Sequence, residues 1–95
     1  MSYFFEESLD VQDMRRFATL VAERARIAVV LSGAAQAYKY AICAQNEAQV
    51  AAFVVRLNSA LEAAGGKSGR MANGVIKADF GEITAFLEGV ASEEF

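Results

Sequence analysis

Residues 65–74 constrain the chain most, because they hold four of its seven glycines and two of its nine basic residues between two apolar segments. Glycine is used where the backbone bends with φ > 0 or approaches another group closely, and the neighbouring Lys67 and Arg70 favour an anion as that group. A helix that ends just before Gly65 would also use this glycine at its C′ position. The stretch therefore predicts a turn at the edge of the fold, with anion binding and helix capping both open.

Gly66, Lys67 and Ser68 match the end of the nucleotide-binding pattern G-x-x-x-x-G-K-[ST]. The first glycine of that pattern would fall at position 61, which is Leu61. The pattern also follows a strand, whereas the stretch in this chain follows a helical periodicity. An ATP or GTP site is therefore not expected.

With 95 residues, of which 55% are hydrophobic, the chain can form one domain with a small core. It has no histidine, and its single cysteine, Cys43, has no partner for an internal disulfide. The usual zinc sets of Cys and His, and the Ser-His or Cys-His pairs of hydrolytic enzymes, are therefore excluded. We expect no catalytic residue, no metal and no cofactor in this domain, and we interpret Cys43 as a small apolar strand residue.

The sequence also predicts a cytoplasmic protein. No apolar run reaches the roughly 18 residues of a membrane-spanning helix. The start of the chain has an aromatic and acidic sequence and lacks the basic region of a signal peptide. We therefore expect a soluble chain in a reducing compartment, without a membrane partner.

Charge is distributed unevenly along the chain, although the net charge is only −3. Residues 14–78 hold all nine basic residues and three acidic ones, which leaves +6, while residues 1–13 carry −4 and residues 79–95 carry −5. A basic middle segment can hold a polyanion, but the same charges can equally be ordinary solvated surface. Both interpretations stay open on charge alone.

Apolar periodicity predicts an α/β (α+β) fold, a two-layer domain with a mixed sheet of three to four strands packed with about three helices. Asp10 and Asn46 suit helix N-caps, and Asp79 with Glu82 forms a further cap pair. Residues 26–32 are apolar on both alternating faces, as in a strand buried on both sides, and are expected to pair with the alternating residues 37–44. The predicted order begins with an edge strand at 3–5, a helix at 11–24, and strands at 26–32 and 37–44 around a turn at 33–36. A helix at 46–64 follows, and then a strand at 71–77 that is interrupted at Asn73 and Gly74. The chain ends with a last helix that includes Ile83, Phe86, Leu87 and Val90, and with a frayed tail at 92–95.

The glycine-rich stretch resembles the sequence mark of the DHH-associated domain, which has the form G-G-K-G-G-G-R-P-D-M-A-Q-G. The resemblance extends over nearly the whole chain, since residues 9–18 are similar to the family's opening helix and residues 25–31 to its first long strand. Ser68 replaces one glycine, the Pro-Asp pair after the arginine is missing, and Asn73 stands where glutamine is usual. The matching residues, in order, are Gly65, Gly66, Lys67, Ser68, Gly69 and Arg70, followed by Met71, Ala72, Asn73 and Gly74.

DHH-associated domains occur at the C-terminus of alanyl-tRNA synthetases, of free-standing alanyl-tRNA editing proteins and of DHH-type phosphoesterases. The resemblance implies that residues 1–95 form a single DHH-associated domain cut from the C-terminus of a larger protein. It implies an accessory, non-catalytic tRNA-binding domain that grips the phosphate backbone with its glycine-rich basic loop, while another domain of the parent enzyme performs the chemistry. The implied contact residues are Gly65, Gly66, Lys67, Ser68, Gly69, Arg70, Asn73, Gly74 and Lys77.

Two alternatives stay open. The first is the substrate-binding domain of a DHH-family phosphoesterase, although such domains typically place a histidine after the glycines and this chain has none. The second is a dimerisation module without a ligand, with Phe4, Phe5, Tyr38 and Tyr40 as its contact surface. The expected partners are therefore tRNA or a short RNA, the remainder of the parent protein, and, under the last alternative, a second copy of the chain.

Overall fold

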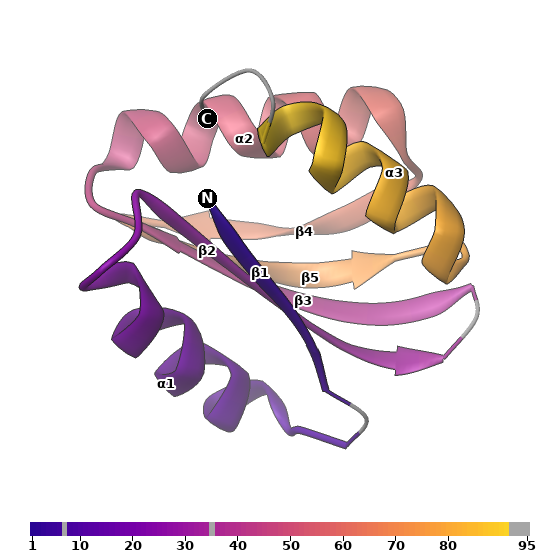
Figure 1. Cartoon of the computed structure of the whole chain (residues 1–95), viewed down its shortest axis with the longest axis horizontal. Helices are drawn as coiled ribbons and strands as arrows, with labels where there is room; N and C mark the ends of the chain where they lie inside the picture. Colours follow the sequence, from indigo (N-terminus) through magenta and orange to yellow (C-terminus); the bar gives the residue numbers. More distant parts are fainter. Residues whose placement is uncertain (7, 35, 92–95) are drawn as a thin grey trace.

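The computed structural model describes residues 1–6, 8–34 and 36–91, and Figure 1 shows them as one mixed sheet with helices on both faces. The sheet has five strands in the order β1-β2-β3-β5-β4, with β1 parallel to β2 and the other neighbours antiparallel. The α+β class and the three helices are confirmed, whereas the prediction of three to four strands is too low. The predicted tail at 92–95 lies outside the described residues. The elements are β1 Ser2–Glu6, α1 Val11–Ala22, β2 Ile27–Ala34, β3 Ala37–Ala44, α2 Glu47–Ala60, β4 Ala63–Ser68, β5 Met71–Ile76 and α3 Phe80–Ala91.

The sheet lies between α1 on one face and α2 with α3 on the other (Figure 1). On β2, Ile27, Val29 and Leu31 join the core beneath α2 and α3. Ala28 and Val30 point to the opposite face and pack with α1. β2 is thus buried on both faces, as its unbroken apolar sequence predicts. Because helices cover both faces, the domain has three layers where periodicity predicts two.

Side-chain caps begin the helices at the predicted residues. Asp10 Oδ1 accepts a hydrogen bond from the N–H of Asp13 at 2.8 Å. Asn46 Oδ1 accepts one from the N–H of Gln49 at 2.9 Å, and Asp79 caps α3 in the same way. Each cap satisfies a backbone donor that has no partner within the helix.

The end of α2 differs from the prediction. The helix ends at Ala60, and Leu61 is already extended with φ −132° and ψ 158°. The chain then enters β4, so Gly65 lies inside a strand and does not have a positive φ. The predicted C′ role of Gly65 is therefore wrong, because pairing with β5 outweighs the weak strand propensity of alanine and glycine.

β3 has the predicted bounds and pairs with β2 as an antiparallel hairpin. β5 is continuous, since Asn73 pairs with Ala41 and Gly74 with Tyr40. The predicted interruption of this strand is therefore wrong. Cys43 of β3 is buried against α1, which confirms its interpretation as a small apolar residue.

Two of the four aromatic residues proposed as a dimerisation surface are buried. Tyr38 and Tyr40 are buried in the core beneath α2 and α3, and Phe5 packs edge to face on Tyr38 with ring centroids 5.9 Å apart. Phe4 lies on the other face, 38% exposed, with its ring centroid 5.1 Å from that of Phe17. Two of the four aromatic residues are thus already covered within the chain and cannot contact a partner.

Candidate nucleic-acid interface

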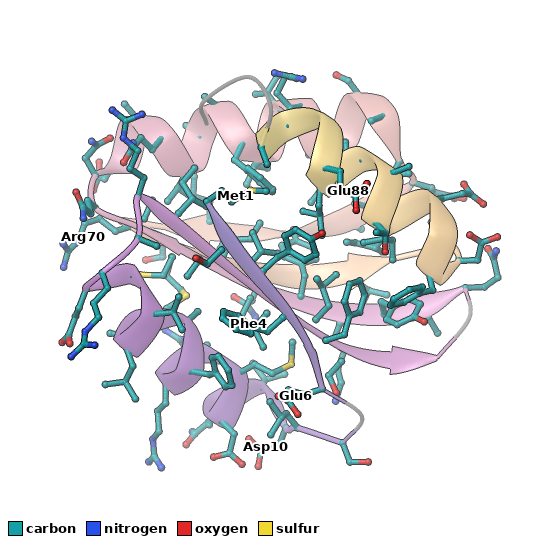
Figure 2. All side chains as sticks on the ribbon, viewed as in Figure 1. Met1, Phe4, Glu6, Asp10, Arg70 and Glu88 are labelled. Carbon is teal, nitrogen blue, oxygen red and sulfur yellow. The ribbon has the colours of Figure 1, made fainter. Side chains whose placement is uncertain are left out.

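β4 and β5 form a hairpin that is closed by a two-residue turn at Gly69 and Arg70. Gly69 has φ 58°, whereas Arg70 is outside the left-handed region. A glycine with positive φ at the first central position is the pattern of a type II′ turn, which suits the twist of the flanking strands. Arg70 therefore stands at the tip of the hairpin, where its exposed side chain lies at one end of the molecule (Figure 2).

Gly65 and Gly74 lie opposite each other in the hairpin and have a packing role. A Cβ added to Gly65 would lie 2.6 Å from Gly74 Cα and 2.7 Å from the Tyr40 hydroxyl. A Cβ added to Gly74 would meet the backbone of Ala64 and lie 2.6 Å from Gly65 Cα. The two glycines therefore let the strands approach closely and leave room for the Tyr40 side chain. Burial in this position raises the pKa of the Tyr40 phenol.

Gly66 differs from these two glycines. It is exposed, and a Cβ added to it would have no atom within 4 Å. Its register with Asn73, which pairs with Ala41, places it on the sheet face that α1 covers in part. No packing contact explains a glycine here, so Gly66 leaves its backbone open to a molecule that approaches the hairpin.

The basic residues of the predicted site are spread along the hairpin. Lys67 is in register with Ala72 and Ile42, which places it on the face of α2, whereas Ser68 lies on the face of α1. Lys77 follows the far end of β5 and donates its N–H to the carbonyl of Glu62 at 2.7 Å. At about 3.3 Å of rise per residue, Arg70 and Lys77 are roughly 23 Å apart. The predicted residues thus form an extended surface and do not converge on one anion.

Sequence reasoning missed a groove between α1 and the start of β5. Arg15, Arg16, Thr19, Leu20 and Met71 line this groove, which has a volume of about 470 Å³. The sequence signal for this groove is the exposed pair Arg15 and Arg16, which is followed about one helical turn later by the exposed Leu20. Met71 is 51 to 56 positions away in the sequence, so only the fold brings the two sides together.

The surface of the hairpin offers cations and backbone groups and no acid–base centre. Within residues 1–6, 8–34 and 36–91, no group of three or more His, Cys, Asp or Glu lies close enough together to hold a metal ion. In the same ranges, no helix is long and apolar enough to cross a membrane. The arrangement is suited to holding an anionic partner by its charge and shape.

The strand order and the helices on both faces define a class of small mixed-sheet α+β domain with an exposed basic hairpin. Among solved structures, the C-Ala domain of the alanyl-tRNA synthetase from Aquifex aeolicus is similar to this chain, with a TM-score of 0.71 and 22% sequence identity. The similarity covers 94% of this chain and 87% of that one, which shows that the two share a fold. No protein-family model and no curated protein matches the chain.

Proposed function

We propose that this chain is an accessory tRNA-binding domain of an alanyl-tRNA synthetase-like or alanyl-tRNA editing protein, and that it grips the phosphate backbone with the β4–β5 hairpin. The observation that carries the proposal is the fold shared with a C-Ala domain over 94% of the chain. The resemblance of residues 65–74 to the DHH-associated domain supports the same function independently of the structure.

The charges on the hairpin support this proposal. Lys67 and Arg70 are exposed, and neither forms an ion pair with another described residue. Two exposed cations without an ion-pair partner among the described residues can neutralise phosphates. Arg70 presents a planar guanidinium that suits two oxygens of one phosphate, while Lys67 acts as a point charge.

The glycines support close approach of the backbone. Gly66 has open space on its exposed side, and Gly69 places Arg70 at the tip of the turn. In this proposal, Ser68 and Asn73 supply hydrogen bonds from the α1 face of the hairpin, next to Gly66. Lys77 contacts a separate phosphate, because it lies at the other end of β5.

We infer that the domain has no catalytic activity of its own and that a different domain of the parent enzyme acts on the tRNA. The purified chain, incubated with short RNA or with mischarged alanyl-tRNA, with and without manganese, should then give no turnover above a blank. Turnover that survives repurification would contradict this inference.

Titration of tRNA at several salt concentrations tests the binding function. Release of counterions from a few phosphates predicts a slope of log K against log salt of roughly −2 to −4. A short RNA of the same nucleotide concentration separates tRNA binding from a phosphoesterase-like preference for short substrates. Absence of binding at low salt, or binding that does not respond to salt, would contradict the proposal.

One structural observation favours the alternative function, in which the chain forms a dimer with a second copy of itself. β4 is the last strand of the sheet, so its outward backbone N–H and C=O groups have no neighbouring strand among the described residues. Such an edge can pair with another strand. Sedimentation of the chain over a range of concentrations decides between the two: a dimer that does not bind tRNA would favour the dimerisation module.

A further inference from the structure

The groove beside α1 combines apolar walls with positive charge. Leu20 is 65% exposed, because it projects from the side of α1 opposite to the buried Met14 and Ala18. Together with Met71 it gives the groove an apolar wall, and its volume of about 470 Å³ is in the range of small-ligand sites. Nothing in the core of the domain needs Leu20 in this position.

Two arginines line the same groove. Arg15 and Arg16 are exposed, and neither forms an ion pair with the residues that the structure describes. The Thr19 hydroxyl donates to the carbonyl oxygen of Arg15 at 2.8 Å, which fixes this hydroxyl at the wall of the groove. Thr19 also lines a second hollow, which Glu23 and Arg70 border, so the groove lies next to the tip of the hairpin.

The sheet beside the groove is open. α1 packs mainly on β2 and β3, and it leaves β4 uncovered on this face. Gly66 and Ser68 of β4 are exposed there, and Val75 of β5 is exposed as well. A bound strand of nucleic acid can therefore reach Gly66 and Ser68 on this face, where Met71, Asn73 and Val75 of β5 lie between them and α1.

We propose that the groove between α1 and β5 binds one unstacked RNA base, with Arg15 and Arg16 on the phosphates that flank it. This inference rests on the proposed RNA-binding function and adds to it a site that contacts a base. A site for duplex backbone alone needs cations and hydrogen-bond donors, but has no use for an exposed leucine and a methionine. An unstacked base has two apolar faces that such side chains and guanidinium planes can cover, and loops of folded RNA present such bases.

The experiment compares two probes of equal charge with the full chain at low salt. One is a fluorescently labelled hexauridylate, and the other is a six-residue ribose-phosphate oligonucleotide of the same charge without bases. Anisotropy should show that the parent binds hexauridylate about tenfold more tightly than the abasic probe, since covering one base contributes an effect of this size. The ratio of the two affinities cancels the contribution of the phosphates.

Variants of Leu20 locate the effect. Leu20→Glu and the uncharged Leu20→Ser should each reduce the affinity ratio to about one. Val55→Glu is the matched control, because Val55 is 64% exposed on α2, on the other side of the sheet, and should keep the tenfold ratio. Both positions are at the surface, so thermal melts should show that all three variants are folded.

The outcomes separate this inference from the function on which it rests. Equal affinity of the parent for both probes, or equal ratios for Leu20→Ser and Val55→Glu, would overturn the base site. If tRNA binding still depends on Lys67 and Arg70 in that case, the tRNA-binding function stands without it. If neither tRNA nor hexauridylate binds at low salt, both proposals are overturned.

Discussion

Replacement of Gly74 by alanine tests whether the glycines of the hairpin serve packing or ligand binding. An alanine Cβ at this position would lie 2.6 Å from Gly65 Cα and 2.9 Å from the carbonyl carbon of Ala64, and would also meet the carbonyl oxygen of Ala64. All of these atoms belong to the backbone of β4, so no side-chain rotation can relieve the overlap. The two strands have to separate where Gly65 and Gly74 face each other.

The expected loss follows from that separation. Overpacking of a well-packed region costs about 1–3 kcal/mol. Disturbance of a neighbouring ladder hydrogen bond adds about 1 kcal/mol. We therefore expect Gly74→Ala to lower the free energy of unfolding by about 2–4 kcal/mol. Urea unfolding followed by circular dichroism measures this as a lower midpoint with an unchanged m-value.

Gly66→Ala is the matched control in the same hairpin. Its Cβ would have no atom within 4 Å, and Gly66 is outside the left-handed region. Its stability should equal that of the parent or exceed it by up to about 1 kcal/mol, because alanine restricts the unfolded chain. If Gly74→Ala unfolds at the same urea concentration as Gly66→Ala, the packing role that we assign to Gly74 is refuted.

The remaining predictions concern binding, pH and the core. Lys67→Ala and Arg70→Ala should each weaken tRNA binding by a similar factor for all tRNA sequences, and each should make the slope of log K against log salt shallower by about one unit. In urea melts, the free energy of unfolding of both variants should stay within ~0.5 kcal/mol of the parent. Arg70→Lys should retain only part of the affinity if the guanidinium holds two phosphate oxygens. Burial raises the pKa of the Tyr40 phenol above its ordinary value of 10.0, so its neutral form is favoured in the folded state. That contribution to stability is present below pH 10 and is lost as pH rises through the raised pKa, and urea melts in alkaline buffers should show a smaller loss for Tyr40→Phe than for the parent. Phe53→Ala should lower the free energy of unfolding by about 3–5 kcal/mol in urea melts, because the ring is 0% exposed and its removal leaves a cavity.

Elements with local sequence signals could be predicted without the structure. Asp10 and Asn46 cap α1 and α2 as predicted, because a cap depends on a side chain and a backbone group three residues apart. β2 and β3 were predicted from their apolar and alternating residues, and their short connection allowed them to pair as a hairpin. The position of Arg70 in a turn also followed from the glycines around it.

The strand at residues 63–68 has no comparable local signal and depends on its packing in the folded domain. Their alanines and glycines have weak strand propensity, and β4 forms because β5 offers a backbone partner while Gly65 and Gly74 leave room for Tyr40. The groove that joins Arg15 and Arg16 to Met71 is also absent from any local pattern, since its two walls are more than 50 residues apart in the chain. The groove, and the contact of Gly65 with Tyr40, depend on residues that are far apart in the chain. Such contacts give no signal in a window of neighbouring residues, because the window contains only one of the two partners.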